Sequence, residues 1–356
     1  MPHFEKRPVL KNLLLIFLGF AALVLQSCST ELDVNAPYKE TKVFYGILDP
    51  TQPFQTFRIG KGFLSDGRSA KDIAKDSPDS SLFDPANLEV TLFEIKLQTT
   101  GRFDTIQKVG LFPDTINNKE VAGDFYAPDQ LVFRTPLMQL DTVTQAGFIH
   151  YFVRIKNKIS GNVSEASTRI PGRELTIRNW AAIGPDVDGP FSLDFGTRKK
   201  TIISVNKTPN TAVIQLSLNW KIQVITETDT IEEIWKMSSG LENDIPGDLK
   251  DIVFGPGSLW NFIQGELTKR GNDKVIGRKI LPSQMEIYAA NKDYDNYRVV
   301  NGNYNAITQS QPVYSNLSNG ALGIFCGRNK RIFSVGLDRS VVDTLNVRFP
   351  DFKLIK

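Results

Sequence analysis

The feature that most constrains the fold is a series of short segments in which apolar and polar residues alternate. The clearest are LEVTLFEIKL at 88–97 and GFIHYFVRIKNK at 147–158, where Ile149, Tyr151 and Val153 share one face. Because side chains of a strand point alternately to its two faces, this pattern predicts strands with one buried face. Similar segments lie at 41–48, 54–60, 174–180, 211–226 and 230–237. The last two flank the short turn ETD and should form a hairpin, so we expect a mainly β protein.

The length of the chain bears on the number of domains. Its 356 residues exceed the usual size of a single hydrophobic core. Pro171 and Gly172 interrupt the strand pattern near the middle. We therefore expect two β-sandwich-like domains, the first immunoglobulin-like at 41–172 and the second β-rich at 173–356.

One segment of the second domain has the periodicity of a helix. At 258–270 the apolar residues of SLWNFIQGELTKR gather on one side. Ser258 is expected to cap the start of this helix, and Gly271 its end. A second helical turn is expected near 291–298, so the second domain should contain one or two short inserted helices.

The first residues have the pattern of an export signal. Lys6, Arg7 and Lys11 precede an apolar run at 13–25. A membrane-spanning helix needs about 20 apolar residues, so this run is too short to be one. A charged start, a short apolar middle and a small residue at the end are typical of a signal peptide, which we expect to occupy 1–27.

The end of this signal contains a cysteine. Leu25-Gln26-Ser27-Cys28 resembles the lipobox of bacterial lipoproteins. The resemblance implies that the Cys28 thiol receives a diacylglycerol, that the chain is cut just before it, and that the new amino terminus is acylated, for example with palmitate. Each buried methylene contributes about 0.8 kcal/mol, so such an anchor would be effectively permanent. Polar residues 28–40 would form a tether; the alternative is a plain signal peptide followed by a chance cysteine.

Two longer stretches resemble lipoproteins of unassigned function that are common in Bacteroidota. One is the opening CSTELDVNAPYKETKVFYGILDPTQPFQTFRIGKGFL, and the other is the closing motif YSNLSNGALGIF at 314–325. The sequence differs from the family pattern at Cys326, where a small residue is expected. Such lipoproteins are often encoded beside TonB-dependent receptors. The resemblance therefore implies an outer-membrane protein, on the periplasmic or cell-surface face, with such a receptor as its partner.

The closing motif also has a simple structural interpretation. Asn319-Gly320 is a tight-turn dipeptide, and ALGIF has the composition of a short buried strand. We therefore expect a hairpin that holds the last strands. Near the other end of the chain, Glu31 and Asp33 fit either the acidic export signal associated with this family or an acidic, solvated tether.

The sequence offers few residues for catalysis or metal binding. It contains two His and two Cys, and only His150 lies outside the leader. His150 is on the strand face opposite Tyr151, which predicts a surface or rim position, so a catalytic triad or a zinc site is not expected. If Cys28 carries lipid, Cys326 has no disulfide partner within the chain.

Other chemical patterns are weak. Asp186 and Asp188 are the best candidates for calcium ligands, but they lack the spacing of an EF-hand and are typical of a polar turn. The S-x-x-K tetrad at 204–207 precedes a turn between strands. Glu232 and Glu233 are adjacent on an expected strand and point to opposite faces. The net charge of +3 is too small to indicate nucleic-acid binding, and we expect no cofactor.

A cluster of five tyrosines lies at 288–314, within the expected second domain. A tyrosine has a flat apolar face and a polar hydroxyl, which suits ligand and partner surfaces. The alternative is a loop whose rings cover the edge of the core. With the long loop at 64–87, the segment 284–315 is our candidate contact region, and its tyrosines are Tyr288, Tyr294, Tyr297, Tyr304 and Tyr314.

These observations predict a non-enzymatic lipoprotein anchored to the outer membrane. We expect it to act as a binding or accessory subunit of a TonB-dependent uptake system. Two other functions stay open. A hydrolase of surface polymers that uses carboxylates alone would need two acids about 5–9 Å apart in one pocket. A structural adhesin would have flat exposed sheet faces and no pocket.

Overall fold

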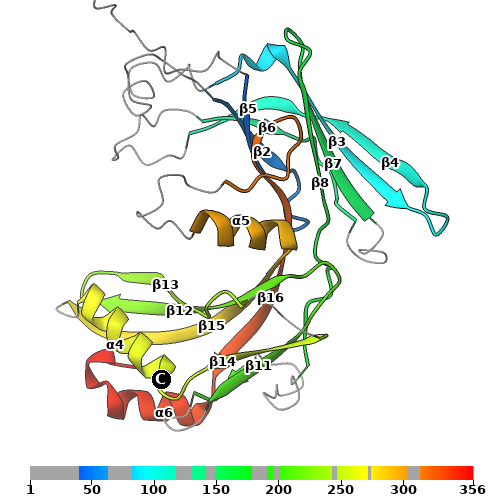
Figure 1. Ribbon diagram of the computed structural model, residues 1–356. Helices are drawn as coiled ribbons and strands as arrows, with labels where there is room; N and C mark the ends of the chain where they lie inside the picture. Colours follow the sequence, from blue (N-terminus) through cyan, green and yellow to red (C-terminus); the bar gives the residue numbers. More distant parts are fainter. Residues whose placement is uncertain are drawn as a thin grey trace, which may run out of the picture. The chain divides into compact units, whose positions relative to one another are not determined.

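The computed structural model of the protein contains three β-sheets, which dominate its described residues (Figure 1). The structure describes residues 40–62, 82–117, 130–141, 149–178, 191–195, 200–242, 247–271, 274–302 and 313–355. The prediction of a mainly β protein is confirmed. The expected signal peptide, Cys28, Glu31, Asp33 and the loop segment 63–81 lie outside the described residues.

Two sheets enclose a core in the first half of the chain. The four-stranded sheet has the order β4 (Phe103–Gly110), β3 (Leu88–Leu97), β7 (Ile149–Asn157) and β8 (Val163–Thr168). Facing it are the largest sheet's strands β1 (Lys42–Leu48), β2 (Thr56–Lys61), β6 (Gln130–Arg134) and β5 (Phe112–Ile116). Ile149, Tyr151 and Val153 are buried in this core, as the alternation predicts. Its immunoglobulin-like character stays a prediction.

The second half contributes the other end of the largest sheet. In order, these strands are β13 (Thr230–Ser238), β12 (Val213–Thr226), β15 (Val275–Ala290) and β16 (Leu322–Leu337), with β10 (Phe191–Leu193) paired to β16. β12 and β13 form the expected hairpin, in which Trp220 lies opposite Trp235. A second core lies on one face of these strands, together with the small sheet of β14 (Leu249–Phe254), β11 (Thr201–Asn206) and β9 (Thr176–Ile177).

The described residues of the second half contain three α-helices rather than one or two. These are α4 (Ser258–Arg270), α5 (Lys292–Gly302) and α6 (Arg339–Arg348). The unexpected α6 has a local signal, because the Asp338 side chain caps it by accepting a hydrogen bond from the Ser340 amide. No described helix has the length and apolar character needed to span a membrane.

The helix expected at 258–270 is confirmed, but its predicted start cap is wrong. The residue before the helix is Gly257, with φ 78°, and Ser258 is the first helical residue. The Ser258 hydroxyl donates to the Gly255 carbonyl at 2.7 Å, so it does not accept from the helix amides. Gly271 does end the helix, with its amide donating to the Leu267 carbonyl at 3.1 Å.

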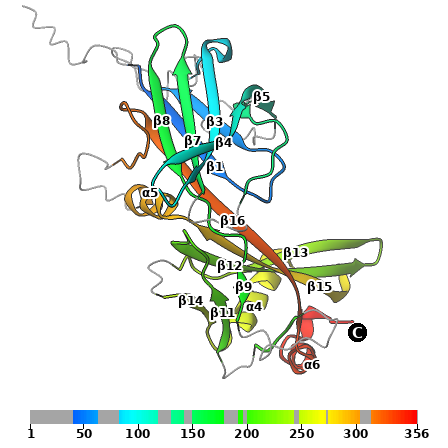
Figure 2. The ribbon, with the colours of Figure 1, turned by 90° about the vertical axis from the view of Figure 1, so that its right-hand side faces the viewer.

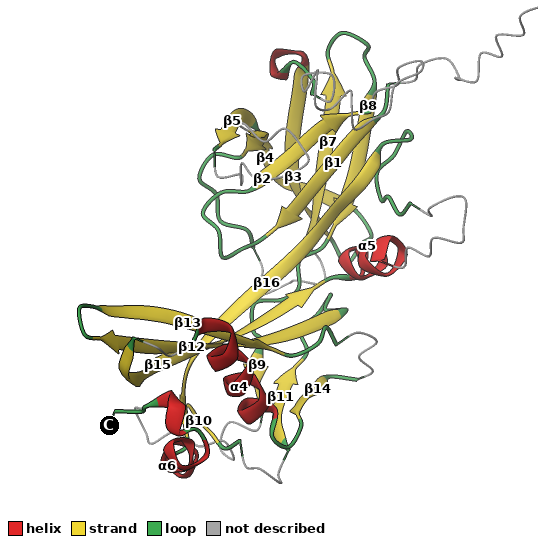
Figure 3. Ribbon diagram, turned by 90° about the vertical axis from the view of Figure 1, so that its left-hand side faces the viewer, coloured by secondary structure: helices red, strands yellow, loops and turns green. Residues whose placement is uncertain are grey.

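Strand β16 belongs to both cores, as its long course in Figures 2 and 3 illustrates. Its first part pairs in parallel with β1, from Leu322 opposite Val43 to Gly327 opposite Leu48. Its second part pairs antiparallel with β15. Phe325 is fully buried in the first core, so that core includes a residue from outside 41–172.

Two glycines permit the close approach of β16 to the first half. Gly323 has φ 109°, and a β-carbon there would lie 1.9 Å from the Phe44 carbonyl oxygen. A β-carbon on Gly327 would lie 2.5 Å from the Arg169 carbonyl oxygen. A side chain at either position would therefore collide with backbone atoms.

The predicted hairpin at the closing motif is wrong. Asn319 and Gly320 do form a left-handed turn, with φ 57° and 70°. However, Ser315 is bridged to Gly323 in parallel, whereas the strands of a hairpin run antiparallel. Side-chain hydrogen bonds replace a paired strand here: the Asn316 amide accepts from the Phe325 N–H at 2.9 Å and donates to the Phe325 carbonyl at 2.7 Å.

Candidate functional site

One face of the large sheet in the second half carries polar side chains. On β15, Met285 and Ile287 belong to the core, while Glu286 and Tyr288 alternate with them on the opposite face. Gln215 of β12 lies opposite Tyr288 in the register. This alternation places the expected contact residue Tyr288 beside polar neighbours from other strands.

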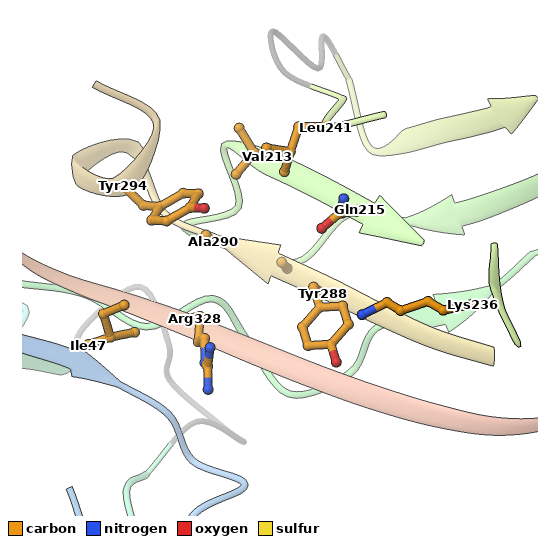
Figure 4. Close-up of a pocket in the computed structure, with 10 residues that line it drawn as sticks. Ile47, Val213, Gln215, Lys236, Leu241, Tyr288, Ala290, Tyr294 and Arg328 are labelled. Carbon is orange, nitrogen blue, oxygen red and sulfur yellow. The ribbon is translucent and has the colours of Figure 1, made fainter. Parts of the chain in front are cut away.

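A pocket of about 250 Å³ opens on this face (Figure 4). It brings together elements that are distant in sequence, namely β1, β12, β13, β15, β16 and the start of α5. Two expected contact residues, Tyr288 and Tyr294, line it together. The full lining is Ile47, Val213, Gln215, Lys236, Leu241, Tyr288, Ala289, Ala290, Tyr294 and Arg328.

Tyr288 is held in place by Glu286. Its hydroxyl donates to Glu286 Oε2 at 2.5 Å. Burial, followed by this hydrogen bond to a carboxylate, raises the pKa of Tyr288 to about 12. Tyr288 therefore keeps its proton at neutral pH, donates it in a hydrogen bond to Glu286, and presents a fixed aromatic wall to the pocket.

Glu286 is stabilised as a carboxylate. Burial favours its neutral form, but hydrogen bonds from Tyr288 and Asn219 and the charges of Lys330 and Lys236 outweigh this effect, so its pKa is lowered. Lys330 Nζ lies 3.6 Å from Glu286 Oε1. An ionised acid tied to a tyrosine and a lysine organises this face and is a poor proton donor.

Cationic side chains give the pocket its charge. Arg328 Nε lies 2.7 Å from Oδ2 of Asp49, which is buried, while about half of the Arg328 side chain stays exposed at 45%. Lys236 comes from the neighbouring hairpin strand β13. The pocket thus combines two tyrosine rings, an amide and two cationic groups, a set suited to noncovalent binding of a planar or anionic group.

The other expected tyrosines have different surroundings. Tyr297 packs edge-to-face on Tyr45, with ring centroids 6.4 Å apart. Tyr314 donates to Asp293 Oδ1 at 3.2 Å, which ties the closing motif to the start of α5. Tyr304 lies outside the described residues. Among the five expected contact residues, the pocket therefore collects Tyr288 and Tyr294.

Sequence reasoning missed three polar residues of this pocket. Gln215, Lys236 and Arg328 come from three strands separated along the chain. The sequence does indicate that Gln215 and Lys236 face away from the core, because they alternate with residues that the strand pattern assigns to it. The register that brings them beside Tyr288 depends on strand pairing, which the alternation does not specify.

Among the described residues, the pocket lining lacks the acids, histidine, serine and cysteine that a hydrolase usually needs. Glu233 is engaged elsewhere, since its Oε2 accepts from Trp235 Nε1 at 2.7 Å. Ser204 of the S-x-x-K tetrad lies on strand β11 and not at the start of a helix.

The described residues offer neither a metal site nor a reactive thiol. Among the described residues, no group of three or more His, Cys, Asp and Glu side chains could hold a metal ion. Asp186 and Asp188 lie outside those residues. Cys326 is a fully buried free thiol, and burial raises its pKa to about 12, so it is not a reactive nucleophile at neutral pH.

Comparisons with known proteins give little. No protein-family model and no curated protein matches the chain. The C-terminal globular domain of oligosaccharyltransferase from Pyrococcus abyssi shares 8% identity at a TM-score of 0.24, covering 79% of this chain and 43% of that one. A DUF4785 family protein from Legionella pneumophila shares 11% at 0.18, covering 66% and 48%. CBD12 from CALX1.2 shares 10% at 0.16, covering 73% and 88%. These scores carry no argument about fold or function, and the chain spans less than half of the first two structures.

Proposed function

We propose that the protein is a lipid-anchored, non-enzymatic binding or accessory subunit of the bacterial outer membrane. Cys28 carries the anchor, residues 28–40 form the tether, and the folded body binds a partner or ligand through the pocket at Tyr288 and Tyr294. The family resemblance supports a TonB-dependent receptor as the partner.

The observation that carries the binding role is the composition of this pocket. Two tyrosines and the cations Lys236 and Arg328 line one pocket, formed by a sheet face and the start of α5. Aromatic and arginine side chains in a pre-formed pocket are typical of sites where partner groups insert. This favours binding over the carboxylate hydrolase, because no acid lines the pocket in the described structure. It also favours binding over an adhesin with flat faces.

Membrane fractionation followed by mild-detergent co-purification tests the proposal. The wild-type protein should sediment with membranes and recover a receptor after extraction. Cys28→Ser should move the protein to the soluble fraction, because the thiol that accepts the lipid is absent. Cys326→Ser is the matched control and should stay with the membranes, since this thiol is buried.

A double variant tests the pocket separately from the anchor. Tyr288→Ala with Tyr294→Ala should leave the membrane fraction unchanged and lose the co-purified receptor. Tyr297→Ala is the control, because Tyr297 packs on Tyr45 and does not line the pocket. A Cys28→Ser protein that still sediments with membranes contradicts the anchor. A receptor retained by the double variant contradicts the binding surface.

A further inference from the structure

A second pocket, of about 350 Å³, lies where the end of β8 meets the start of α5. It shares no residue with the pocket at Tyr288, and its volume lies within the range of about 300–1,000 Å³ that is usual for ligand sites. All the side chains that line it are polar. They are His150, Ser167, Thr168, Arg169, Asn210, Asn291, Lys292 and Asp293.

Among the described residues that line this pocket, the one acid, Asp293, accepts three hydrogen bonds from the protein. Asp293 Oδ2 accepts hydrogen bonds from Thr168 Oγ1 at 2.9 Å and from Asn291 Nδ2 at 3.0 Å. Its other oxygen accepts from Tyr314. Asp293 therefore links the elements that form the pocket wall, and three hydrogen-bond donors stabilise its charge.

The cations of the pocket are less fully engaged. The exposed guanidinium of Arg169 has no hydrogen bond or ion pair with any residue that the structure describes. Lys292 Nζ contacts Asp295 Oδ2 at 2.8 Å, but Asp295 also binds Arg298 at 3.0 Å. One carboxylate thus serves two cations, which leaves an excess of positive charge beside the free guanidinium.

A buried polar atom also lacks a partner here. His150 Nε2 is buried and makes no hydrogen bond within the described part of the chain. Its ring packs edge-to-face on Phe103, with centroids 5.7 Å apart. Burial, and then the charge of Arg169, lower the pKa of His150, so the imidazole is neutral. This unpaired nitrogen is an exception to the rule that buried polar atoms in folded proteins have a hydrogen-bond partner, and it lies beside the two cations.

We propose that this pocket binds a small oxyanion, the carboxylate or phosphate group of a small molecule, held by Arg169 and Lys292 beside His150. A guanidinium presents a planar fork of N–H donors that matches the oxygens of either group. The pocket has room for an organic substituent on the anion. This site is independent of the binding surface proposed above, so either proposal can fail without the other.

Histidine NMR provides a local test. In a His3→Gln background, His150 is the only histidine of the chain, so its imidazole signals report on this pocket alone. The full-length protein in detergent would be titrated with inorganic phosphate and, separately, with acetate. Sodium chloride at equal ionic strength is the reference. We expect a saturable shift of the His150 signals with at least one of the two oxyanions, and none with chloride.

Charge variants then identify the ligand-binding group. Arg169→Gln should weaken oxyanion binding about tenfold or more, because it removes a charged hydrogen-bond donor. Arg173→Gln is the matched control, since Arg173 is exposed nearby and does not line the pocket. Lys292→Gln is a second variant in case Arg169→Gln fails to fold. Shifts equal to those in chloride, or equal losses in the Arg169 and Arg173 variants, overturn the proposal.

Discussion

Replacement of Phe325 by alanine tests whether the chain's last long strand completes the first core. The Phe325 ring is fully buried and lies edge-to-face on Phe44 and Phe57, with centroids 6.0 and 5.8 Å away. Burial of such a ring contributes about 1.5–3 kcal/mol. Each edge-to-face contact adds about 0.5–1.5 kcal/mol. Together, burial and the two contacts give about 2.5–6 kcal/mol, which includes the cost of about 3–5 kcal/mol that is typical of Phe→Ala in a core, and we expect a loss of that size.

Denaturant unfolding of the full-length protein measures this loss. All four tryptophans lie at 180–260, so their fluorescence reports on the second half, whereas far-UV circular dichroism reports on strands of both halves. Phe325→Ala should therefore produce an early transition by circular dichroism that precedes the change in fluorescence. Leu322→Ala is the control on the same strand, because Leu322 is 39% exposed, and it should cost less than about 1 kcal/mol. An unfolding curve for Phe325→Ala that matches this control refutes the shared core.

Two further predictions concern backbone space and pH. Gly323→Ala should destabilise the protein by about 3 kcal/mol or more in urea unfolding, because its β-carbon would meet the Phe44 carbonyl at a positive φ. The control is Gly101→Ala, at φ 80° in open space, which should cost only about 1–2 kcal/mol. Equal losses in the two variants would contradict the steric argument. Burial raises the pKa of Asp295, but the hydrogen bonds and charges of Lys292 and Arg298 outweigh it and lower the pKa. A lowered folded-state pKa means that Asp295 stabilises the protein above its unfolded value of about 3.9 and loses this effect as the pH falls below it. Asp295→Asn should thus cost about 1–3 kcal/mol of unfolding free energy at pH 7, and its stability should fall less steeply below about pH 4. The control is Glu232→Gln at an exposed position, which should change neither the stability nor its pH dependence. Unfolding midpoints across pH 3–7 measure both effects, and wild-type behaviour of Asp295→Asn would exclude the ion pairs as a source of stability.

Local pattern determined much of the secondary structure. The alternation at 88–97 and 147–158 predicted β3 and β7 and the buried face of β7, because side-chain period depends only on neighbouring residues. The hairpin of β12 and β13 followed from the short turn between two alternating segments. The end of α4 at Gly271 followed from glycine's freedom at a helix terminus.

The failures have a common cause, which is a hydrogen bond to a partner other than the one that local chemistry favours. Asn319-Gly320 has the composition of a hairpin turn, but Asn316 bonds to the backbone of Phe325 and Ser318 to that of Glu165. Ser258 has the chemistry of a helix cap, but Gly257 before it adopts the left-handed conformation and the hydroxyl turns back to Gly255. In both places a nonlocal or alternative hydrogen bond replaced the one that local chemistry favours.

The sequence by itself determined the mainly β character, the positions of several strands, and which of their residues face a core. It also contains the lipobox-like cysteine on which the predicted anchor depends. Only the tertiary structure decided that β16 joins both cores, and that Gln215, Lys236 and Arg328 meet Tyr288 and Tyr294 in one pocket. The physical reason is that a strand's period is encoded in adjacent residues, whereas its register and its neighbours depend on pairings between residues far apart in the chain.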